Sequence, residues 1–316
     1  MKLGELGISP WAARAFAFVW GCLWGSFVNV VVYRLPREMS VVRPGSHCPA
    51  CGASVSPLDN IPLVSWLLLA GRARCCGARI SARYPAVELL GGVVALAIAD
   101  ALFRTSPPET AAVRAAAIFL ANFALAMALV AAAFIDAGHM YLPDVITIGG
   151  TVFGLATPGL RDLTWLDGLA GAAIGFVGVW LPLVVGYQAL RGRPGMGLGD
   201  AKLLMLAGAW YGWRGAVFVL FGGALQASLV AALLMLVHGK IEEPEAVRKD
   251  REALHEAAMA GDEEARDALR DDPLATAPAE GFMAQRLPFG PFLCLGTIEW
   301  MLAGQWIAER VTWLRG

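Results

Sequence analysis

Two aspartates stand where long apolar stretches of the chain begin or end. Asp136 closes the uncharged stretch Ala115–Ile135, and Asp200 opens another apolar segment after the run Gly195-Met196-Gly197-Leu198-Gly199. A charged side chain at membrane depth is costly, so an ionisable residue there is a candidate functional group. Two carboxyl groups in different environments can act as a general acid/base pair, in which one activates water and the other donates a proton.

We expect the environments of these two aspartates to differ. Glycines at 195, 197 and 199 permit unusual backbone torsions, and Asp200 then lies in a first helical turn, where the helix macrodipole favours a carboxylate. Asp136 follows a helix C-terminus, where the dipole disfavours negative charge. Both lie at the cytoplasmic ends of their helices in the orientation that the arginines predict, so they can meet. The residues alone favour an aspartyl hydrolase and leave open a proton-coupled transporter that uses the same acids as a relay.

Other acids near the predicted spans are weaker candidates. Glu88 and Asp100 lie within the apolar stretch Tyr84–Phe103, and Asp144 lies close to a predicted interface. An acid near the end of a span can merely mark the water boundary, which is the interpretation we prefer for Asp100.

A cluster of cysteines forms a second candidate site. It comprises Cys48, Cys51, Cys75 and Cys76. The remaining two, Cys22 and Cys294, lie inside apolar stretches, where a buried thiol usually acts as a small hydrophobic side chain. Four cysteines in one short polar stretch indicate a metal site, because disulfides are rare in a reducing cytosol.

The composition is that of a polytopic membrane protein. Of the 316 residues, 57% are hydrophobic and 16% are charged, whereas soluble domains have about half and about a quarter. Mean hydropathy is +0.58. These values exclude an ordinary soluble enzyme, a disordered chain and a disulfide-stapled secreted domain. The formal net charge of −1 gives no reason to expect a nucleic-acid partner.

The apolar stretches predict an all-α fold with about eight transmembrane helices, since a span needs about 20 mostly apolar residues. The predicted spans are Ala15–Tyr33, Tyr84–Phe103, Ala115–Ile135, Val145–Leu160, Gly168–Leu190, Leu203–Trp213, Gly215–Val237 and Leu287–Ala308. Two of them, Val145–Leu160 and Leu203–Trp213, are short and are included because each is the only apolar connection between longer neighbours. No internal repeat is apparent.

Arginines set the predicted orientation in the membrane. The segment from Arg34 to Arg83 holds seven arginines and no lysine, so the positive-inside rule places it in the cytoplasm and both termini outside. The first helix runs into Arg34 without a small-residue cleavage pattern, so we expect it to be retained. A second cytoplasmic segment, Gly239–Arg286, carries seven basic and thirteen acidic residues, and we interpret it as a solvated helical insertion.

Seven short motifs follow one another along most of the chain. They are Gly25-Ser26-Phe27-Val28-Asn29-Val30 with Tyr33-Arg34-Leu35-Pro36, Cys48-Pro49-Ala50-Cys51, Asn60-Ile61-Pro62 to Ser65, Tyr84-Pro85 to Glu88, Ile135-Asp136 with Leu142-Pro143-Asp144, Gly197-Leu198-Gly199-Asp200-Ala201-Lys202, and Pro288-Phe289-Gly290-Pro291. A lone GxGD run is weak evidence. In this order, and with this predicted topology, the motifs resemble the type IV prepilin leader peptidases, the bifunctional peptidase/N-methyltransferases of bacterial inner membranes.

The resemblance implies a GxGD-type intramembrane aspartyl protease with Asp136 and Asp200 as its catalytic pair, whereas Asp144 matches a family acid that is not catalytic. It implies substrates that are type IV prepilins or type II secretion pseudopilins, cut after a glycine at the cytoplasmic membrane face and then N-methylated with S-adenosylmethionine. No glycine-rich nucleotide loop is visible, so the residues that contact this cofactor stay unknown. The implied location is the bacterial inner membrane, in a multi-pass arrangement within the lipid bilayer.

The resemblance also implies a structural zinc site, from which this sequence departs. Bifunctional family members usually have two CxxC pairs in the first cytoplasmic loop, and four thiolates suit a closed tetrahedral zinc site. The second pair should fall at positions 73 and 76, where this chain has Ala73 and Cys76. Three outcomes are open: Cys75 supplies the fourth ligand after a local backbone adjustment, His47 or water completes the sphere, or the site has decayed.

These expectations define five segments and leave rival functions. The segments are a first transmembrane helix (1–35), a cytoplasmic loop domain with the zinc site (36–83), a membrane core with the catalytic aspartates (84–238), the charged insertion (239–286), and a last helix with the tail (287–316). The insertion replaces the family's usual short link, and it either docks a partner from the pilus or secretion machinery or has no role. The rivals are a peptidase without methyltransferase activity, the proton-coupled transporter, and a zinc-dependent assembly protein without catalysis.

Overall fold

The computed structural model describes residues 9–192, 195–271 and 286–310. Their regular structure is helical, and among them the β-structure is limited to two isolated bridges, His47–Ser54 and Arg72–Arg79. The predicted all-α class is therefore confirmed for the described part of the chain. Part of the predicted insertion (272–285) and most of the predicted tail (311–316) lie outside it.

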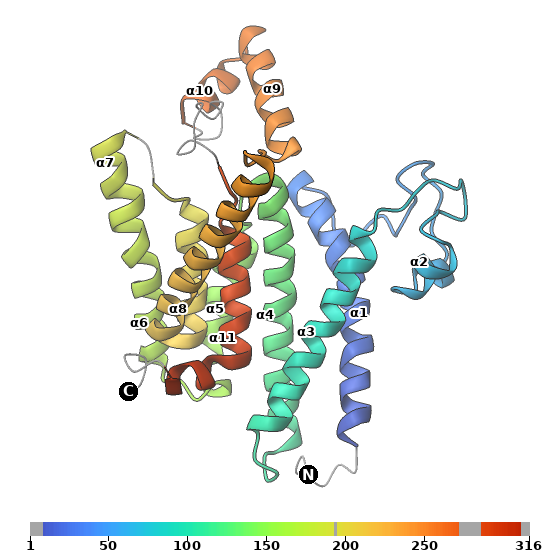
Figure 1. Cartoon of the computed structure of the whole chain (residues 1–316), viewed down its shortest axis with the longest axis vertical. Helices are drawn as coiled ribbons and strands as arrows, with labels where there is room; N and C mark the ends of the chain where they lie inside the picture. Colours follow the sequence, from blue (N-terminus) through green and yellow to red (C-terminus); the bar gives the residue numbers. More distant parts are fainter. Residues whose placement is uncertain (1–8, 193–194, 272–285, 311–316) are drawn as a thin grey trace. The chain divides into compact units, whose positions relative to one another are not determined.

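Figure 1 shows the helices in chain order. They are α1 (Pro10–Arg34), α2 (Val64–Leu68), α3 (Arg83–Thr105), α4 (Ala112–His139), α5 (Asp144–Ala156), α6 (Trp165–Val179), α7 (Tyr187–Arg191), α8 (Leu198–His238), α9 (Glu245–Met259), α10 (Glu263–Asp271) and α11 (Gly290–Arg310). A π-helical segment (Trp180–Gly186) joins α6 to α7, so these two form one apolar stretch. Short 3₁₀ turns lie at Leu35–Arg37, Pro57–Asn60 and Pro158–Leu160.

Five helices in the described residues are long and apolar enough to cross a membrane, against the eight spans that the sequence predicted. They cover Pro10–Arg37, Arg83–Thr105, Ala112–His139, Trp165–Arg191 and Leu198–His238. The shorter apolar helix α5 corresponds to one further predicted span, and α11, which carries Glu299, corresponds to another. The chain is thus an all-α membrane protein, and the count of eight crossings stays a prediction.

The remaining difference lies in α8, which contains two of the predicted spans. Gly212 interrupts this 41-residue helix with φ 68° and ψ −175°, a conformation that residues with a Cβ rarely adopt. The kink lies at the second-to-last residue of the predicted span Leu203–Trp213, shortly before Gly215–Val237. The predicted break falls within a few residues of this kink, and whether the two halves of α8 are separate crossings stays a prediction.

The chain divides into two compact units, residues 1–131 and 132–316. In the first unit α1 packs closely against α3 through small residues. A Cβ on Gly21 would clash with the carbonyl oxygen of Gly91, and a Cβ on Gly25 would lie 2.7 Å from the Cα of Glu88. Small residues at these positions let two apolar helices approach closely, as is common in membranes.

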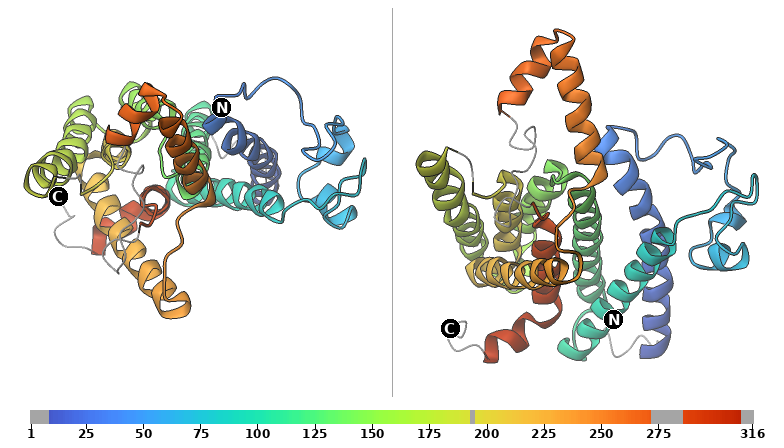
Figure 2. Two further views of the ribbon diagram at one scale, coloured as in Figure 1. Left: turned by 90° about the horizontal axis from the view of Figure 1, so that it is seen from above. Right: turned by 45° about the horizontal axis from the view of Figure 1, so that its top comes forward.

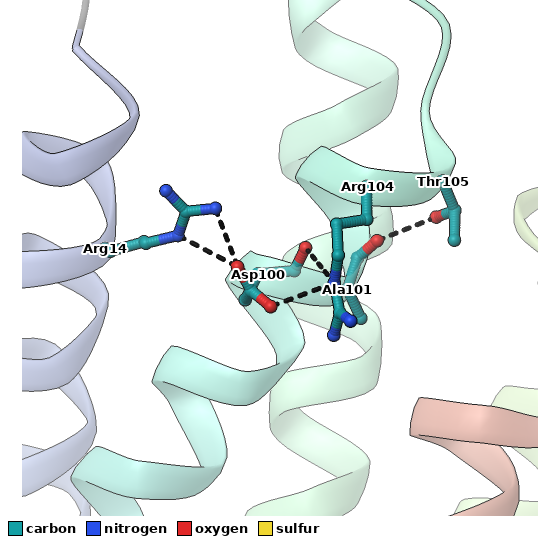
Figure 3. A network of polar contacts seen from close by, with 5 residues as sticks. All are labelled: Arg14, Asp100, Ala101, Arg104 and Thr105. Atoms are coloured by element: carbon teal, nitrogen blue, oxygen red, sulfur yellow. Dashed lines mark hydrogen bonds and ion pairs between the residues drawn. The ribbon is translucent and has the colours of Figure 1, made fainter.

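An ion pair joins α1 and α3 near the N-terminal end of α1. The Arg14 guanidinium donates from Nε and Nη2 to Asp100 Oδ1 at 3.0 and 2.6 Å, and Arg104 Nε lies 2.9 Å from Asp100 Oδ2 (Figure 3). The carboxylate of Asp100 therefore has a structural partner on each side. This arrangement agrees with the expectation that Asp100 is not a chemical site.

In the second unit α8 lies among α5, α6 and α11 (Figure 2). Most residues of its stretch 201–210 are buried, and the fully buried Trp210 donates from Nε1 to the carbonyl oxygen of Gly150 on α5 at 2.8 Å. A Cβ on Gly208 would clash with the carbonyl oxygen of Gly171 on α6. Close packing on these sides fixes the start of α8, which carries Asp200.

Candidate active site and metal centre

Asp136 lies in the last turn of α4 and is almost fully buried, with 6% of its surface exposed. Its Oδ2 accepts a hydrogen bond from the backbone amide of Gly290 at 2.9 Å. Because α11 begins at Gly290, the carboxylate faces the N-terminal end of that helix, where free amides and the macrodipole favour negative charge. The sequence placed Asp136 only at the C-terminal end of α4. The structure adds the N-terminal end of α11, which favours a negative charge on Asp136, whereas the C-terminal end of α4 disfavours it.

Asp200 lies in the first turn of α8, as the glycine pattern predicted. Gly197 is the N-cap residue, and a Cβ on it would lie 3.1 Å from Asp200 Oδ2. The preceding glycines thus leave room for the carboxylate against the backbone. As a whole residue Asp200 is partly exposed, whereas Asp136 is buried.

The structure brings Asp136 and Asp200 within range of a direct electrostatic interaction. Leu142, which is buried, packs between their neighbours: a Cβ on Gly199 would lie 3.2 Å from Leu142 Cβ, and a Cβ on Gly290 would lie 3.0 Å from its Cδ2. One leucine therefore sets the spacing between the start of α8 and the start of α11. Two interacting carboxyl groups are candidates for an acid/base pair.

Asp144, the third acid of this region, has a different partner. Its Oδ1 accepts from Lys202 Nζ at 2.6 Å, which ties the first turn of α5 to the second turn of α8. The Asp144 side chain is 59% exposed. This contact gives both residues a structural role beside the pair.

Sequence reasoning did not assign roles to Gly290, Leu142 and Lys202. Each belongs to a motif that was recognised, namely the Pro288–Pro291 run, the Leu-Pro-Asp run and the end of the GxGD run. The signal that could have found Gly290 was a glycine between two prolines just before an apolar helix. Such a position is typical of a helix start whose amides face a neighbour.

The four clustered cysteines meet in the loop between α1 and α3. All four Sγ atoms lie within 4.8 Å of one another, with Cys51 and Cys75 3.3 Å apart and Cys48 and Cys76 3.7 Å apart. Tetrahedral zinc with Zn–S bonds of about 2.3 Å requires sulfurs about 3.8 Å apart, so the spacing fits a four-thiolate site. Of the two candidates for the fourth ligand, Cys75 contributes one of these four sulfur atoms. His47 instead contacts the carbonyl oxygen of Gly45 through Nδ1.

The cysteines stand on two turns of the same design. In the first, Cys48 donates its amide to Ala53 and accepts from the amide of Gly52, at 2.8 and 2.9 Å. In the second, Ala73 does the same with Ala78 and Gly77, each at 2.8 Å. The two glycines have φ of 73° and 71°. The chain therefore contains a short local repeat, in which Cys-Pro-Ala-Cys-Gly-Ala recurs as Ala-Arg-Cys-Cys-Gly-Ala, in the register that the resemblance implied for the second cysteine pair. The expectation of no internal repeat overlooked it.

This repeat confirms the register that placed the missing cysteine at 73. Ala73 occupies the position that Cys48 holds in the first turn, and Cys75, inside the second turn, brings its sulfur to the cluster instead. Backbone amides of Cys51 and Ala50 lower the pKa of the Cys48 thiol to about 6, which favours its thiolate form. The hydrogen bond between Cys51 and Cys75 and the loss of hydration within the cluster raise the pKa of Cys75 to about 12. A divalent cation would replace such protons.

Buried polar contacts attach this loop to the helices that flank it. Glu88 on α3 accepts from the amide of Leu63 at 2.7 Å, and Leu63 has a positive φ of 61°. Arg34, at the end of α1, donates to the carbonyl oxygen of Ser40 at 3.0 Å. Glu88 and Arg34 are 9% and 5% exposed. Glu88 and Arg34, two ionisable residues of the recognised motifs, therefore anchor the cysteine loop to α3 and α1.

Comparison with known proteins agrees with this arrangement. A model of the bacterial peptidase A24 N-terminal domain matches residues 19–102, and a model of the type IV leader peptidase family matches residues 123–236. Among curated relatives, the prepilin leader peptidase/N-methyltransferase of Myxococcus xanthus is 34% identical over 318 residues, which cover 93% of this chain and 91% of that protein. The chain belongs to the type IV leader peptidase family.

Further relatives with the same name show similar coverage. That of Aeromonas hydrophila is 38% identical over 71% of this chain and 81% of its own, and that of Pseudomonas aeruginosa is 34% identical over 77% and 87%. No solved structure matches. The first family match contains the cysteine cluster, and the second contains Asp136 and Asp200. The insertion and Gly290 lie beyond both matched ranges.

Proposed function

We propose that this chain is a membrane aspartyl peptidase that removes the leader from type IV prepilins or type II secretion pseudopilins, with Asp136 and Asp200 as its catalytic pair. The observation that carries the proposal is the meeting of these two acids, one from the end of α4 and one from the start of α8. The names of the curated relatives support the substrate class.

The pair can perform peptide hydrolysis without a covalent intermediate. One carboxylate removes a proton from a water molecule, whose oxygen then bonds to the scissile carbonyl carbon, while the other carboxyl group protonates the carbonyl oxygen. Collapse of this tetrahedral species breaks the C–N bond, and the departing nitrogen takes a proton from the pair. Because two nearby acids titrate together, we assign the two roles to the pair and not to single residues.

We place this chemistry at the cytoplasmic face of a bacterial inner membrane. The arginines between α1 and α3 support that orientation by the positive-inside rule. Both aspartates lie at ends of apolar helices, which suits a substrate whose leader is in water and whose following segment is in the bilayer. In this orientation the charged insertion also lies in the cytoplasm.

The same chain is proposed to methylate the new N-terminus with S-adenosylmethionine, as the names of the relatives indicate for them. When bound, that cofactor would supply an electrophilic methyl group for transfer to the amine nitrogen. The protein must present the amine in its neutral form. We assign no residue to this step.

Zinc is the proposed occupant of the cysteine cluster, held by Cys48, Cys51, Cys75 and Cys76. The sulfur spacing supports this assignment, and four thiolates leave no open position, so the ion would be structural. Few large apolar side chains are buried in the cysteine loop, so a metal would contribute much of its stability.

The test follows substrate mass with purified protein in detergent and a prepilin from the same cell, with and without S-adenosylmethionine. We expect the wild type to remove the leader and, with the cofactor, to add one methyl group. Asp136→Asn and Asp200→Asn should abolish cleavage, whereas Asp144→Asn, which changes the charge equally nearby, should retain it. No cleavage by folded wild type would overturn the peptidase and return the aspartates to a transport function. Cleavage without methylation would leave a peptidase alone.

A further inference from the structure

An ionic clamp lies at the base of the charged insertion. Glu243, between α8 and α9, accepts from Arg251 Nη1 on α9 at 2.7 Å through Oε2, and its Oε1 lies 3.6 Å from Arg286 Nη1. The three side chains are 11%, 12% and 24% exposed. We refer to Arg251, Glu243 and Arg286 as the clamp.

The clamp differs from the other ion pairs described in the insertion. Lys240–Glu242, Lys249–Glu245 and Arg248–Glu252 join side chains that are 58–75% exposed. Exposed pairs of this kind contribute little, whereas a buried charge that loses its partner is strongly destabilising. A purely solvated insertion has no need of charges taken out of water, so the clamp indicates a fixed geometry.

That geometry leads directly to the candidate active site. Arg286 is followed by Leu287, Pro288 and Phe289, and the next residue is Gly290, whose amide donates to Asp136 Oδ2 at 2.9 Å. Pro288 restricts the backbone between the two contacts. The clamp therefore holds one end of a four-residue segment, and Asp136 holds the other.

The insertion can supply such a support because it is itself folded. Val247 and Ala258 on α9 and Ala265 on α10 are buried, so the two helices pack on each other. Arg251 thus stands on a helix that is packed within the insertion, and Glu243 lies two residues before the start of that helix. A displacement of about 1 Å at a reacting group can lower a rate about a hundredfold, so support at this distance matters.

We propose that the clamp is a positioning device for the peptidase: Glu243 and Arg251 fix Arg286, and through residues 287–289 they keep the amide of Gly290 on Asp136. The inference rests on the proposed peptidase activity for its functional consequence. It gives the insertion a role in the reaction, where the sequence suggested a solvated segment or a docking surface.

The experiment compares Glu243→Gln with Glu242→Gln, its exposed neighbour, which loses the same charge. We expect Glu243→Gln to lower kcat for prepilin cleavage about tenfold or more with little change in KM, and Glu242→Gln to stay near the wild type. Arg286→Lys, which keeps the charge, should recover activity that Arg286→Gln loses. In a Gly290→Ala background Glu243→Gln should cost little more, because both changes act through one contact.

Hydrogen exchange of the peptide that spans 286–293 provides a readout that needs no substrate. Faster exchange there in Glu243→Gln than in Glu242→Gln is expected whether or not the chain cleaves prepilin. Equal exchange in the two variants would overturn the clamp, even if the peptidase is correct. Inactive wild type with the expected difference in exchange would instead overturn the peptidase. Equal loss of cleavage and of thermal stability, without rescue by Arg286→Lys, would mean a general folding defect and would also overturn the positioning role.

Discussion

Gly290 and Asp136 are 154 positions apart and are joined by a hydrogen bond of 2.9 Å from the glycine amide to Oδ2 of the carboxylate. A Cβ at Gly290 would lie 2.7 Å from that same oxygen. The position thus requires an amide donor and tolerates no side chain. This pair links the first helix after the insertion to Asp136, which we propose as one of the two catalytic acids.

The first prediction concerns Gly290→Ala. The added Cβ would displace the Asp136 carboxylate or the start of α11, so we expect kcat for leader cleavage to fall about tenfold to a hundredfold. Gly296→Ala is the matched control, because it lies on the same helix and its Cβ would meet its nearest neighbour at an ordinary 3.5 Å. Steady-state cleavage kinetics measure both, and equal activity of the two variants would contradict a steric requirement at Gly290.

The second prediction concerns the tether between Asp144 and Lys202. Because the Asp144 side chain is 59% exposed, the pair should contribute about 1 kcal/mol or less to the stability of the protein. Asp144→Asn and Lys202→Gln should each lower thermal stability slightly, and the double variant should cost little more than either alone. All three should still cleave. Loss of cleavage in Asp144→Asn as severe as in Asp136→Asn would place Asp144 among the catalytic acids.

The third prediction concerns Asp100, which two arginines contact. Arg14 is 22% exposed and Arg104 is 69% exposed, so the Arg14 contact should carry most of the stabilisation. Asp100→Asn should therefore lower the thermal stability clearly, whereas Arg104→Gln should change the free energy of unfolding by about 0.5 kcal/mol or less. Cleavage per folded molecule should stay unchanged in both. Loss of cleavage without loss of stability in Asp100→Asn would show that this acid has a chemical role.

The sequence predicted the fold class well and the helix boundaries less well. Apolar runs located α1, α3 and α4, because hydrocarbon thickness imposes a length that composition reveals. The sequence predicted two separate spans where the structure has one kinked helix, α8. The kink depends on the backbone torsions of Gly212, which the composition of the segment does not reveal. Close contacts such as that of Gly208 with Gly171 also could not be predicted. A small residue permits close packing, but the sequence does not indicate which helix packs against it.

For the candidate site, the sequence identified the acids but not their surroundings. The spacing of Asp136 and Asp200 around apolar helices made their meeting predictable. The contact of Gly290 with Asp136 was not, because about fifty residues of insertion separate α8 from α11. The clamp was hidden for the same reason: Glu243 is one of thirteen acids in a segment whose composition suggests solvation, and only burial distinguishes it.

The last prediction concerns the register of the cysteine loop. If Cys75 supplies the fourth sulfur because Ala73 cannot, Cys75→Ala should lower the zinc content and the thermal stability of the purified protein. The double variant Ala73→Cys with Cys75→Ala should restore both, because Ala73 holds the backbone position that Cys48 holds in the first turn. Cys22→Ala removes a buried thiol outside the cluster and should leave the zinc content unchanged. Full zinc in Cys75→Ala alone would show that three thiolates and another ligand suffice, and that Cys75 is dispensable.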